Sequence, residues 1–258
     1  MFSNIYPTFE KGRVLKSTML ENLRDYPRDF TELYYQDYSD GIVVGTTISV
    51  QESFLVISKG MVKFNGRIYA LETDFELPYS ATGKETIIKV KFHDEQIHPD
   101  FIAFQSTIFL DDNRSLQNGE LELGRFKLKE GARLRCQFED FYDFATEFNT
   151  INYIHCQYAG IQTSTIHPLI LRSYAKEILK HQLTNCYDIS FAMQCLNNGQ
   201  MEREVILFYI GNRLGVGYKE WTNEQIHHQL GRILQEVKGG NRSPRGLAFG
   251  KPQRMIVD

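Results

Sequence analysis

The sequence has no surplus of basic residues and no long apolar run. Its 29 lysines and arginines are outnumbered by 32 acidic residues, so the formal net charge is -3 and the pI is about 6.2. A dedicated nucleic-acid-binding protein carries a basic surface, so we expect no nucleic-acid partner. Every apolar run ends before the roughly 18 residues that suggest a membrane span, so we expect no membrane insertion.

The chain also lacks the marks of secretion. Its first residues, MFSNIYPTFEKGR, have neither the basic start nor the unbroken apolar stretch of a signal peptide. We therefore expect the protein to be made and folded in the cytoplasm. No CxxC pair occurs among Cys136, Cys156, Cys186 and Cys195, so we interpret them as free, mostly buried thiols rather than disulfide or metal ligands.

Nucleotide-binding and hydrolase motifs are missing. Gly83-Lys84 is followed by Glu85 and Gly250-Lys251 by Pro252, so neither completes a P-loop. Gly215-Val216-Gly217 follows a predicted helix and indicates a loop between two helices rather than a dinucleotide site. The sequence contains no G-x-S-x-G elbow and no H-E-x-x-H helix.

Four groups of reactive side chains have simpler interpretations. His155 and Cys156 are neighbours, which face opposite ways in a strand, and His227-His228 are predicted to form a solvated pair on a helix. Asp111-Asp112-Asn113 is typical of a turn. The acidic residues of the fourth group are predicted to form the polar face of a surface helix: Glu139, Asp140, Asp143 and Glu147. We therefore predict no catalytic residue, no cofactor and no metal, and no enzymatic activity.

The composition nevertheless supports a real core, since 42% of the residues are hydrophobic and 24% are charged. The order of patterns predicts an α+β fold with short N-terminal helices, an antiparallel β-rich domain with hairpins and a C-terminal helical bundle. The predicted boundaries are an arm with short helices at 1–39, the β-rich domain at 40–135, the helical domain at 136–240 and a flexible tail at 241–258.

In the first segment, residues 1–13 are predicted to form an extended arm. A T-x-x-E capping box, Thr18 and Glu21, then predicts a short helix that Pro27 ends, and Asp29 can begin a second one.

The β-rich segment contains several apolar runs with a period of two. Strands are predicted at 42–50, 54–58, 61–64, 67–71, 86–92, 101–110 and 120–129. Asn65-Gly66 lies between two of them and predicts a two-residue type I′ hairpin turn. The apolar phase changes within the last strand, which predicts a β-bulge at Gly124-Arg125.

Helical periodicity returns near residue 136. A first helix there carries a phenylalanine stripe, Phe138, Phe141 and Phe148 with Ala145. Further helices are predicted at 168–183, from an Asn185 cap to about residue 199, at 202–214, and from a Thr222–Gln225 capping box to the glycines at 239–240. The stripe of the last helix consists of Ile226, Leu230, Ile233, Leu234 and Val237.

Residues 40–71 carry a recognisable pattern. The elements are Asp40-Gly41-Ile42, Gly45, Ile57-Ser58, Gly60, and Asn65-Gly66-Arg67 with Tyr69. This segment resembles a β-module of phage and prophage tail, baseplate and tail-appendage proteins, including those of phage tail-like bacteriocin particles. The common form has proline before Gly60, where this chain has Lys59. The resemblance covers about 30 residues strongly and leaves the helical third outside it.

The resemblance implies a structural baseplate subunit that is made in the bacterial cytoplasm and assembled in a virion or tail-like particle. Its partners would be other tail or baseplate subunits and copies of itself, in a three- or six-fold assembly. Both ends of the chain offer aromatic, apolar or basic anchors with no local core to enter, and these are the candidate interface residues: Phe2, Tyr6, Phe9, Arg242, Arg245, Leu247, Phe249 and Arg254. Two alternatives remain, a receptor- or carbohydrate-binding module at the particle tip and a wall-degrading hydrolase.

Overall fold

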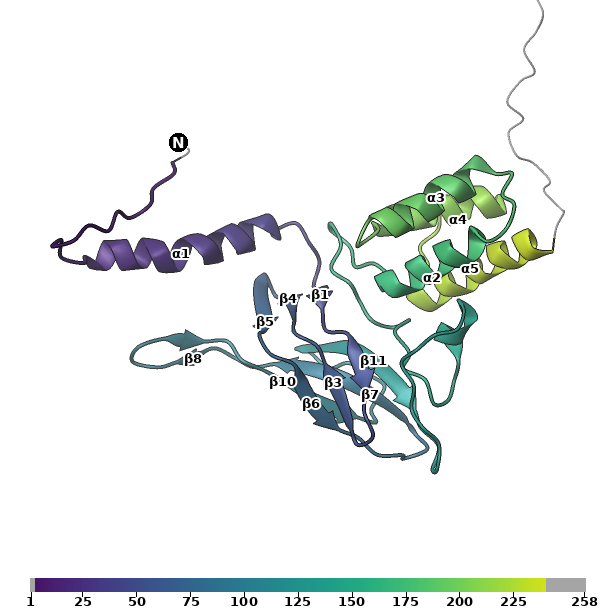
Figure 1. Cartoon of the computed structure of the whole chain (residues 1–258), viewed down its shortest axis with the longest axis horizontal. Helices are drawn as coiled ribbons and strands as arrows, with labels where there is room; N and C mark the ends of the chain where they lie inside the picture. The colour runs from purple at the N-terminus through teal and green to yellow at the C-terminus, as the bar shows by residue number, and fades with distance from the viewer. Residues whose placement is uncertain (1–2, 240–258) are drawn as a thin grey trace, which may run out of the picture. The chain divides into compact units, whose positions relative to one another are not determined.

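The computed structural model describes residues 3–239, which form two compact units. Unit 1 contains the described residues up to 137 together with 145–167, and unit 2 contains 138–144 and the described residues from 168. The fold is α+β, with antiparallel sheets in unit 1 and a helical C-terminal region in unit 2 (Figure 1). The predicted fold class is confirmed.

Helix α1, Ser17–Tyr34, is one continuous helix where two short ones were expected. Pro27 lies inside it, and the apolar residues keep the same face before and after this proline. The hydroxyl of Thr31 donates to the carbonyl oxygen of Pro27 at 2.8 Å. The predicted capping box is also wrong, because the N-cap is Lys16, whose side chain makes no capping hydrogen bond, and Thr18 lies in the first turn.

Six short strands build two antiparallel sheets from the segment 41–78. One sheet has the order β1-β4-β5, with β1 at Gly41–Gly45, β4 at Gly60–Phe64 and β5 at Arg67–Leu71. The other has the order β2-β3-β6, with β2 at Ile48–Val50, β3 at Phe54–Ile57 and β6 at Phe75–Pro78. The predicted strand 42–50 is divided because Gly45 and Thr46 both take a positive φ, of 72° and 53°.

The third sheet has the order β10-β7-β11, with β7 at its centre. Its strands are β7, Glu85–Phe92, β10, Ser106–Asp111, and β11, Glu120–Lys127. The register of β11 against β7 shifts between Glu122 and Gly124, so the β-bulge exists one residue before the predicted position. A small hairpin joins β7 to β10 through β8, Gln96–Ile97, and β9, Ile102–Ala103, so the expected strand 101–110 is interrupted.

The core of unit 1 is formed by β-branched and leucine side chains of these sheets. At most 1% of each of the following is exposed: Ile42, Leu55, Ile57, Ile87, Ile88 and Leu123. Burying each such side chain contributes about 1.5–3 kcal/mol. The β-rich segment therefore has its own core.

The helix expected from residue 136 is absent. A single 3-10 turn, η1 at Tyr142–Ala145, replaces it, because the carboxylate of Asp140 accepts hydrogen bonds from the backbone amides of Tyr142 and Asp143 and closes a tight turn. The phenylalanine spacing was correctly recognised as core-directed at Phe141, which is fully buried.

Four helices form the rest of unit 2. They are α2, Pro168–Ile178, α3, Cys186–Asn197, α4, Arg203–Leu214, and α5, Asn223–Lys238. Asn185 caps α3 by accepting from the amide of Tyr187, and the capping box of Thr222 with Gln225 is complete. Gly215 ends α4 in the left-handed conformation, as a loop between two helices requires.

Candidate protein-interaction surface

Helix α1 is strongly amphipathic, yet none of its residues is buried. At 100° per residue, its apolar side chains occupy one face about 140° wide. We call this the α1 apolar face, and it consists of Met19, Leu20, Leu23, Tyr26, Pro27, Phe30, Leu33 and Tyr34. The six large side chains other than Met19 are between 50% and 65% exposed. A face of this kind keeps much of its contact with water, so covering it with a partner lowers the free energy of the system.

The arm before α1 extends the exposed apolar surface. Ile5, Tyr6, Phe9, Val14 and Leu15 are all more than half exposed, and Val14 reaches 83%. Tyr6 and Phe9 are two of the predicted interface residues, and their role as contacts stays a prediction. The others, Phe2, Arg242, Arg245, Leu247, Phe249 and Arg254, lie outside the described residues.

The C-terminal end of α1 is attached to the β-rich segment through Lys63 of β4. The ammonium nitrogen of Lys63, a residue only 4% exposed, donates to the carbonyl oxygens of Tyr35, Gln36 and Tyr38 at 2.5, 3.0 and 2.5 Å. A helix end leaves carbonyl groups without partners and carries a partial negative charge, so a buried cation there is doubly favoured. The attachment holds one end of α1 and leaves its apolar face uncovered.

Charges line the other side of α1. Arg24 donates to both carboxylate oxygens of Asp25 at 2.7 and 2.9 Å, and Arg28 donates to Asp25 at 3.2 Å and to Asp29 at 3.4 Å. The hydrogen bond from Arg24 lowers the pKa of Asp25. These groups are in water, so each ion pair contributes little to stability and can be exchanged for another at low cost.

The residues of the pattern at 40–71, which we call the tail-module pattern, form close backbone contacts and a hairpin turn. Gly45 and Gly60 face each other across β1 and β4 so closely that a Cβ on Gly45 would lie 2.2 Å from the carbonyl oxygen of Lys59. Asn65 and Gly66 have φ values of 48° and 77° and join Phe64 directly to Arg67, as a two-residue hairpin turn demands. Asp40 accepts from the amide of Asn65 at 2.9 Å. The pattern thus builds the scaffold from which α1 projects.

The two acidic clusters also hold structure. Asp111 accepts from the ammonium group of the fully buried Lys89 at 2.8 Å, and this hydrogen bond lowers the pKa of Asp111. Glu120 is the second partner of Lys89, at 3.1 Å. Asp112 accepts from the hydroxyl of Thr86. A buried lysine needs such partners, so these carboxylates are occupied with compensating its charge.

In the second cluster, Asp140 and Asp143 accept backbone hydrogen bonds at the start of η1, and Glu147 forms an ion pair with Lys127 at 2.7 Å. The histidine pair differs from expectation. His227 is buried, with Nε2 3.1 Å from the carbonyl oxygen of Phe141, and only His228 is exposed. The stripe of α5 extends to position 227, one residue after Ile226, which explains the burial.

Cysteine burial is mixed. Cys156 and Cys195 are buried, Cys136 is half-buried and Cys186 is exposed. Burial raises the pKa of the Cys156 thiol well above its usual value, which disfavours a reactive thiolate beside His155. Within residues 3–239, no three histidine, cysteine or acidic side chains gather in a way that could hold a metal ion.

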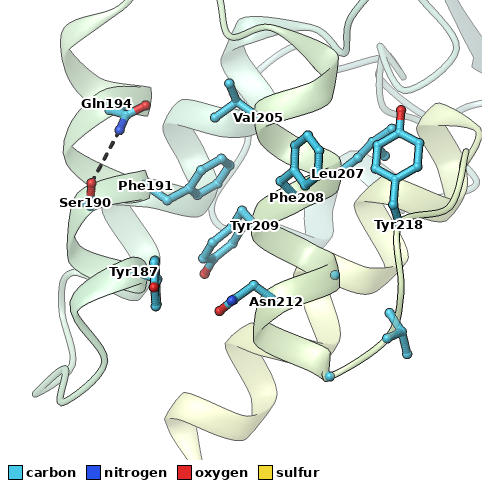
Figure 2. A pocket seen from close by; sticks show the side chains of 13 residues that line it. Tyr187, Ser190, Phe191, Gln194, Val205, Leu207, Phe208, Tyr209, Asn212 and Tyr218 are labelled. Atoms are coloured by element: carbon cyan, nitrogen blue, oxygen red, sulfur yellow. Dashed lines mark hydrogen bonds between the residues drawn. The ribbon is translucent and has the colours of Figure 1, made fainter. Parts of the chain in front are cut away.

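An apolar pocket that no sequence motif predicted lies between α3 and α4. Its volume is about 610 Å³, and Figure 2 shows aromatic side chains from both helices and from the loop after α4 around it. Tyr187, Phe208 and Tyr218 are about half exposed at its rim, while the amides of Gln194 and Asn212 supply polar groups. Five of the lining residues are aromatic, and helical periodicity alone assigns such residues to a core.

The β8–β9 hairpin is a further exposed apolar element that the sequence reasoning missed. Ile97 is 78% exposed, and Phe101 and Ile102 are each 59% exposed. One continuous strand was predicted at 101–110, because the apolar residues of the hairpin continue the apolar pattern of β10.

No family model matches the sequence, and no curated protein matches it. Two of the solved structures that are similar to this chain concern TssK. One is a crystal structure of TssK, with 9% identity and a TM-score of 0.40 over 92% of this chain and 69% of that chain. The other is a chain of the TssK-TssF-TssG baseplate subcomplex of a type VI secretion system, with 9% identity and a TM-score of 0.37 over 91% of this chain and 99% of that chain. Such values describe a coarse likeness of backbone arrangement and carry no conclusion about residues or partners.

A search of the described helices finds none that combines the length and the apolar character needed to cross a membrane.

Proposed function

We propose that this chain is a structural, non-enzymatic subunit of the baseplate of a phage tail or phage tail-like particle, and that it acts through protein–protein assembly. One observation carries the proposal: α1 and the arm before it present eleven large apolar side chains, all at least half exposed, and α1 contains no buried residue. A soluble monomer gains nothing from such a surface, whereas an assembled subunit buries it.

The tail-module pattern of residues 40–71 favours a phage tail or tail-like particle as the place of this assembly. Its glycines and its Asn-Gly turn form the tight β-scaffold that holds Lys63 beneath the end of α1. The proposal assigns no catalytic role to the acidic clusters, since they already compensate Lys89 or cap a turn.

The test is incorporation into particles. Tails or tail-like particles from a producing strain are purified and their chains identified by mass spectrometry, for the wild type and for Leu23→Asp on the α1 apolar face. We expect the wild type in intact particles and the variant in the free pool. Thr18→Asp introduces the same carboxylate on the charged side of the helix, about 60° beyond Leu33, and should be incorporated normally. Absence of the wild-type chain from intact particles would contradict the proposal.

A second candidate, a receptor- or carbohydrate-binding module, is favoured by the α3–α4 pocket. Half-exposed aromatic rings beside amide groups are the usual surface for stacking against sugar rings. The full chain is applied to a glycan array, alongside Tyr218→Ala. A signal that the variant loses would support this function, and an array without signal would argue against it.

A further inference from the structure

The charges beside the α1 apolar face are not randomly placed. Viewed down the helix, Arg24 and Arg28 lie beyond one edge of the face, next to Leu20, at about 40° and 80° from it. Asp29 and Asp25 lie beyond the other edge, next to Leu33, at the same two angular steps. The surface therefore has one basic edge, one acidic edge and an apolar centre.

We infer that the α1 apolar face binds the same face of other copies of this chain, with three α1 helices packed parallel around a cyclic axis. The inference deepens the proposed function and rests on it, because it names the partner of the surface assigned there.

The charged edges determine the orientation. In a parallel cyclic arrangement, the edge that carries Arg24 and Arg28 meets the neighbour's edge that carries Asp25 and Asp29, so opposite charges lie together at every interface. In an antiparallel pair the two-fold axis runs across the helices, and each edge meets its own copy. Arginines would then face arginines and carboxylates would face carboxylates, which is unfavourable. The existing pairs within one helix are exposed and can be exchanged.

The width of the face favours three copies over two. Leu20, Leu23, Pro27, Phe30 and Tyr34 follow the 3-4 spacing of a coiled-coil seam. Met19, Tyr26 and Leu33 widen the seam on one side to about 140°, more than one straight neighbour covers. Covering the six large side chains removes roughly 600–800 Å² per copy, close to the roughly 800 Å² per partner of a specific interface.

The attachment through Lys63 fits the same arrangement. It holds the C-terminal end of α1 against the β-scaffold of its own copy. Parallel helices place all three scaffolds at one end of the bundle, where a cyclic axis can relate them.

Self-association is tested with the purified full chain, without other subunits, by light scattering across micromolar concentrations. We expect the mass of three copies for the wild type and of one copy for Leu23→Asp, with both folded by circular dichroism. Thr18→Asp, on the charged side of α1, should keep the mass of three. A monomeric wild type, or self-association that Leu23→Asp leaves intact, would overturn the inference.

The charged edges are tested by exchanging them. Arg24→Asp with Arg28→Asp makes both edges acidic and should weaken association at least about tenfold. Adding Asp25→Arg and Asp29→Arg reverses both edges, restores opposite charges at each interface and should restore association. If the fourfold variant remains as weak as the double variant, the edges do not pair between copies.

Orientation is tested by cysteine crosslinking in a Cys186→Ser background, since Cys186 is the exposed native thiol among the described residues. In a parallel bundle Leu20→Cys crosslinks to itself, and so does Tyr34→Cys. A crosslink that forms only when the two variants are mixed would show antiparallel packing. A monomeric chain that still enters particles would overturn the three-copy bundle alone, whereas a three-copy chain absent from particles would overturn only the baseplate role.

Discussion

Helices α1 and α5 have the same kind of sequence and opposite surroundings. Both are long and amphipathic. In α5 the stripe residues Ile226, Leu230, Ile233 and Leu234 are fully buried, whereas six large side chains of the α1 apolar face are at least half exposed. An apolar stripe therefore shows that a helix needs a covering surface, and it does not show whether the same chain supplies it. In α5 the other helices of unit 2 supply it. For α1 we propose that another molecule supplies it.

The largest effect should separate the two helices directly. Leu230→Ala removes a fully buried side chain from α5 and should lower the free energy of unfolding by about 2–5 kcal/mol. Leu23→Ala on α1 removes an exposed side chain and should change the stability of the monomer by less than about 0.5 kcal/mol. Urea unfolding of both variants, below the concentration at which the chain associates, makes the measurement. Equal losses of stability in the two variants would contradict the difference in burial between α1 and α5.

Acid should act on the buried histidines before it reaches the carboxylates of α1. Burial lowers the pKa of His227 on α5, and burial lowers the pKa of His167 in unit 1 to about 3. A histidine in the unfolded chain has a pKa of about 6.5. Below that pH it is protonated in the unfolded chain, while the buried histidine of the folded chain stays neutral. Stability should fall by about 1.4 kcal/mol per pH unit for His167 between pH 6.5 and about 3.

Melting curves from pH 7 to about 4.5 follow this loss for the wild type. His227→Gln should give a shallower slope than the wild type, because it removes one buried titrating group. His228→Gln alters the exposed neighbour and should leave the slope unchanged. A steeper loss in His228→Gln than in His227→Gln would reverse the assignment of the buried ring.

A third test asks whether the β-rich part of unit 1 is well ordered although α1 is exposed. Gly66 has a φ of 77° and no atom within 4 Å of its would-be side chain, so Gly66→Val meets only backbone strain. We expect a loss of about 1–3 kcal/mol, measured by urea unfolding. Lys84→Val makes a similar change at an exposed site and should cost less. An unchanged midpoint in Gly66→Val would mean that the hairpin turn tolerates another geometry.

The smallest effect concerns the helix starts. Thr222 accepts from the amide of Gln225 as the N-cap of α5, so Thr222→Ala should cost about 1 kcal/mol. Thr18 carries the same T-x-x-E spacing but lies inside the first turn of α1, so Thr18→Ala should be nearly neutral. Thermal melting of the two variants compares them. A larger loss for Thr18→Ala would restore the capping box that the sequence suggested.

Local signals predicted what local interactions determine. The caps at Asn185 and Thr222 and the Asn65-Gly66 turn were found because each is closed within a few residues. Pro27 misled the prediction, since a proline costs an interior helix a hydrogen bond without always ending it. The expected helix after 136 failed for a related reason, because Asp140 offered the backbone a tighter turn.

The candidate surfaces could be predicted only in part. Tyr6 and Phe9 were predicted as contacts from an arm without a core of its own, and that role stays a prediction, whereas the α1 residues were assigned only to short helices. The α3–α4 pocket and the β8–β9 hairpin escaped because aromatic and apolar residues there follow core-like patterns. Whether such residues are covered depends on tertiary packing, which periodicity does not encode.

Because Lys63 holds the end of α1, the position of α1 depends on the correct register of the β4–β5 hairpin. Side chains alternate across a strand, so a β4–β5 hairpin closed one residue out of register would turn Lys63 to the opposite face of its sheet. The carbonyl groups at the end of α1 would then lose the cation that holds them. A misregistered chain would therefore lose this hold on its helix, and in the proposed assembly it would not present the α1 apolar face from a fixed position.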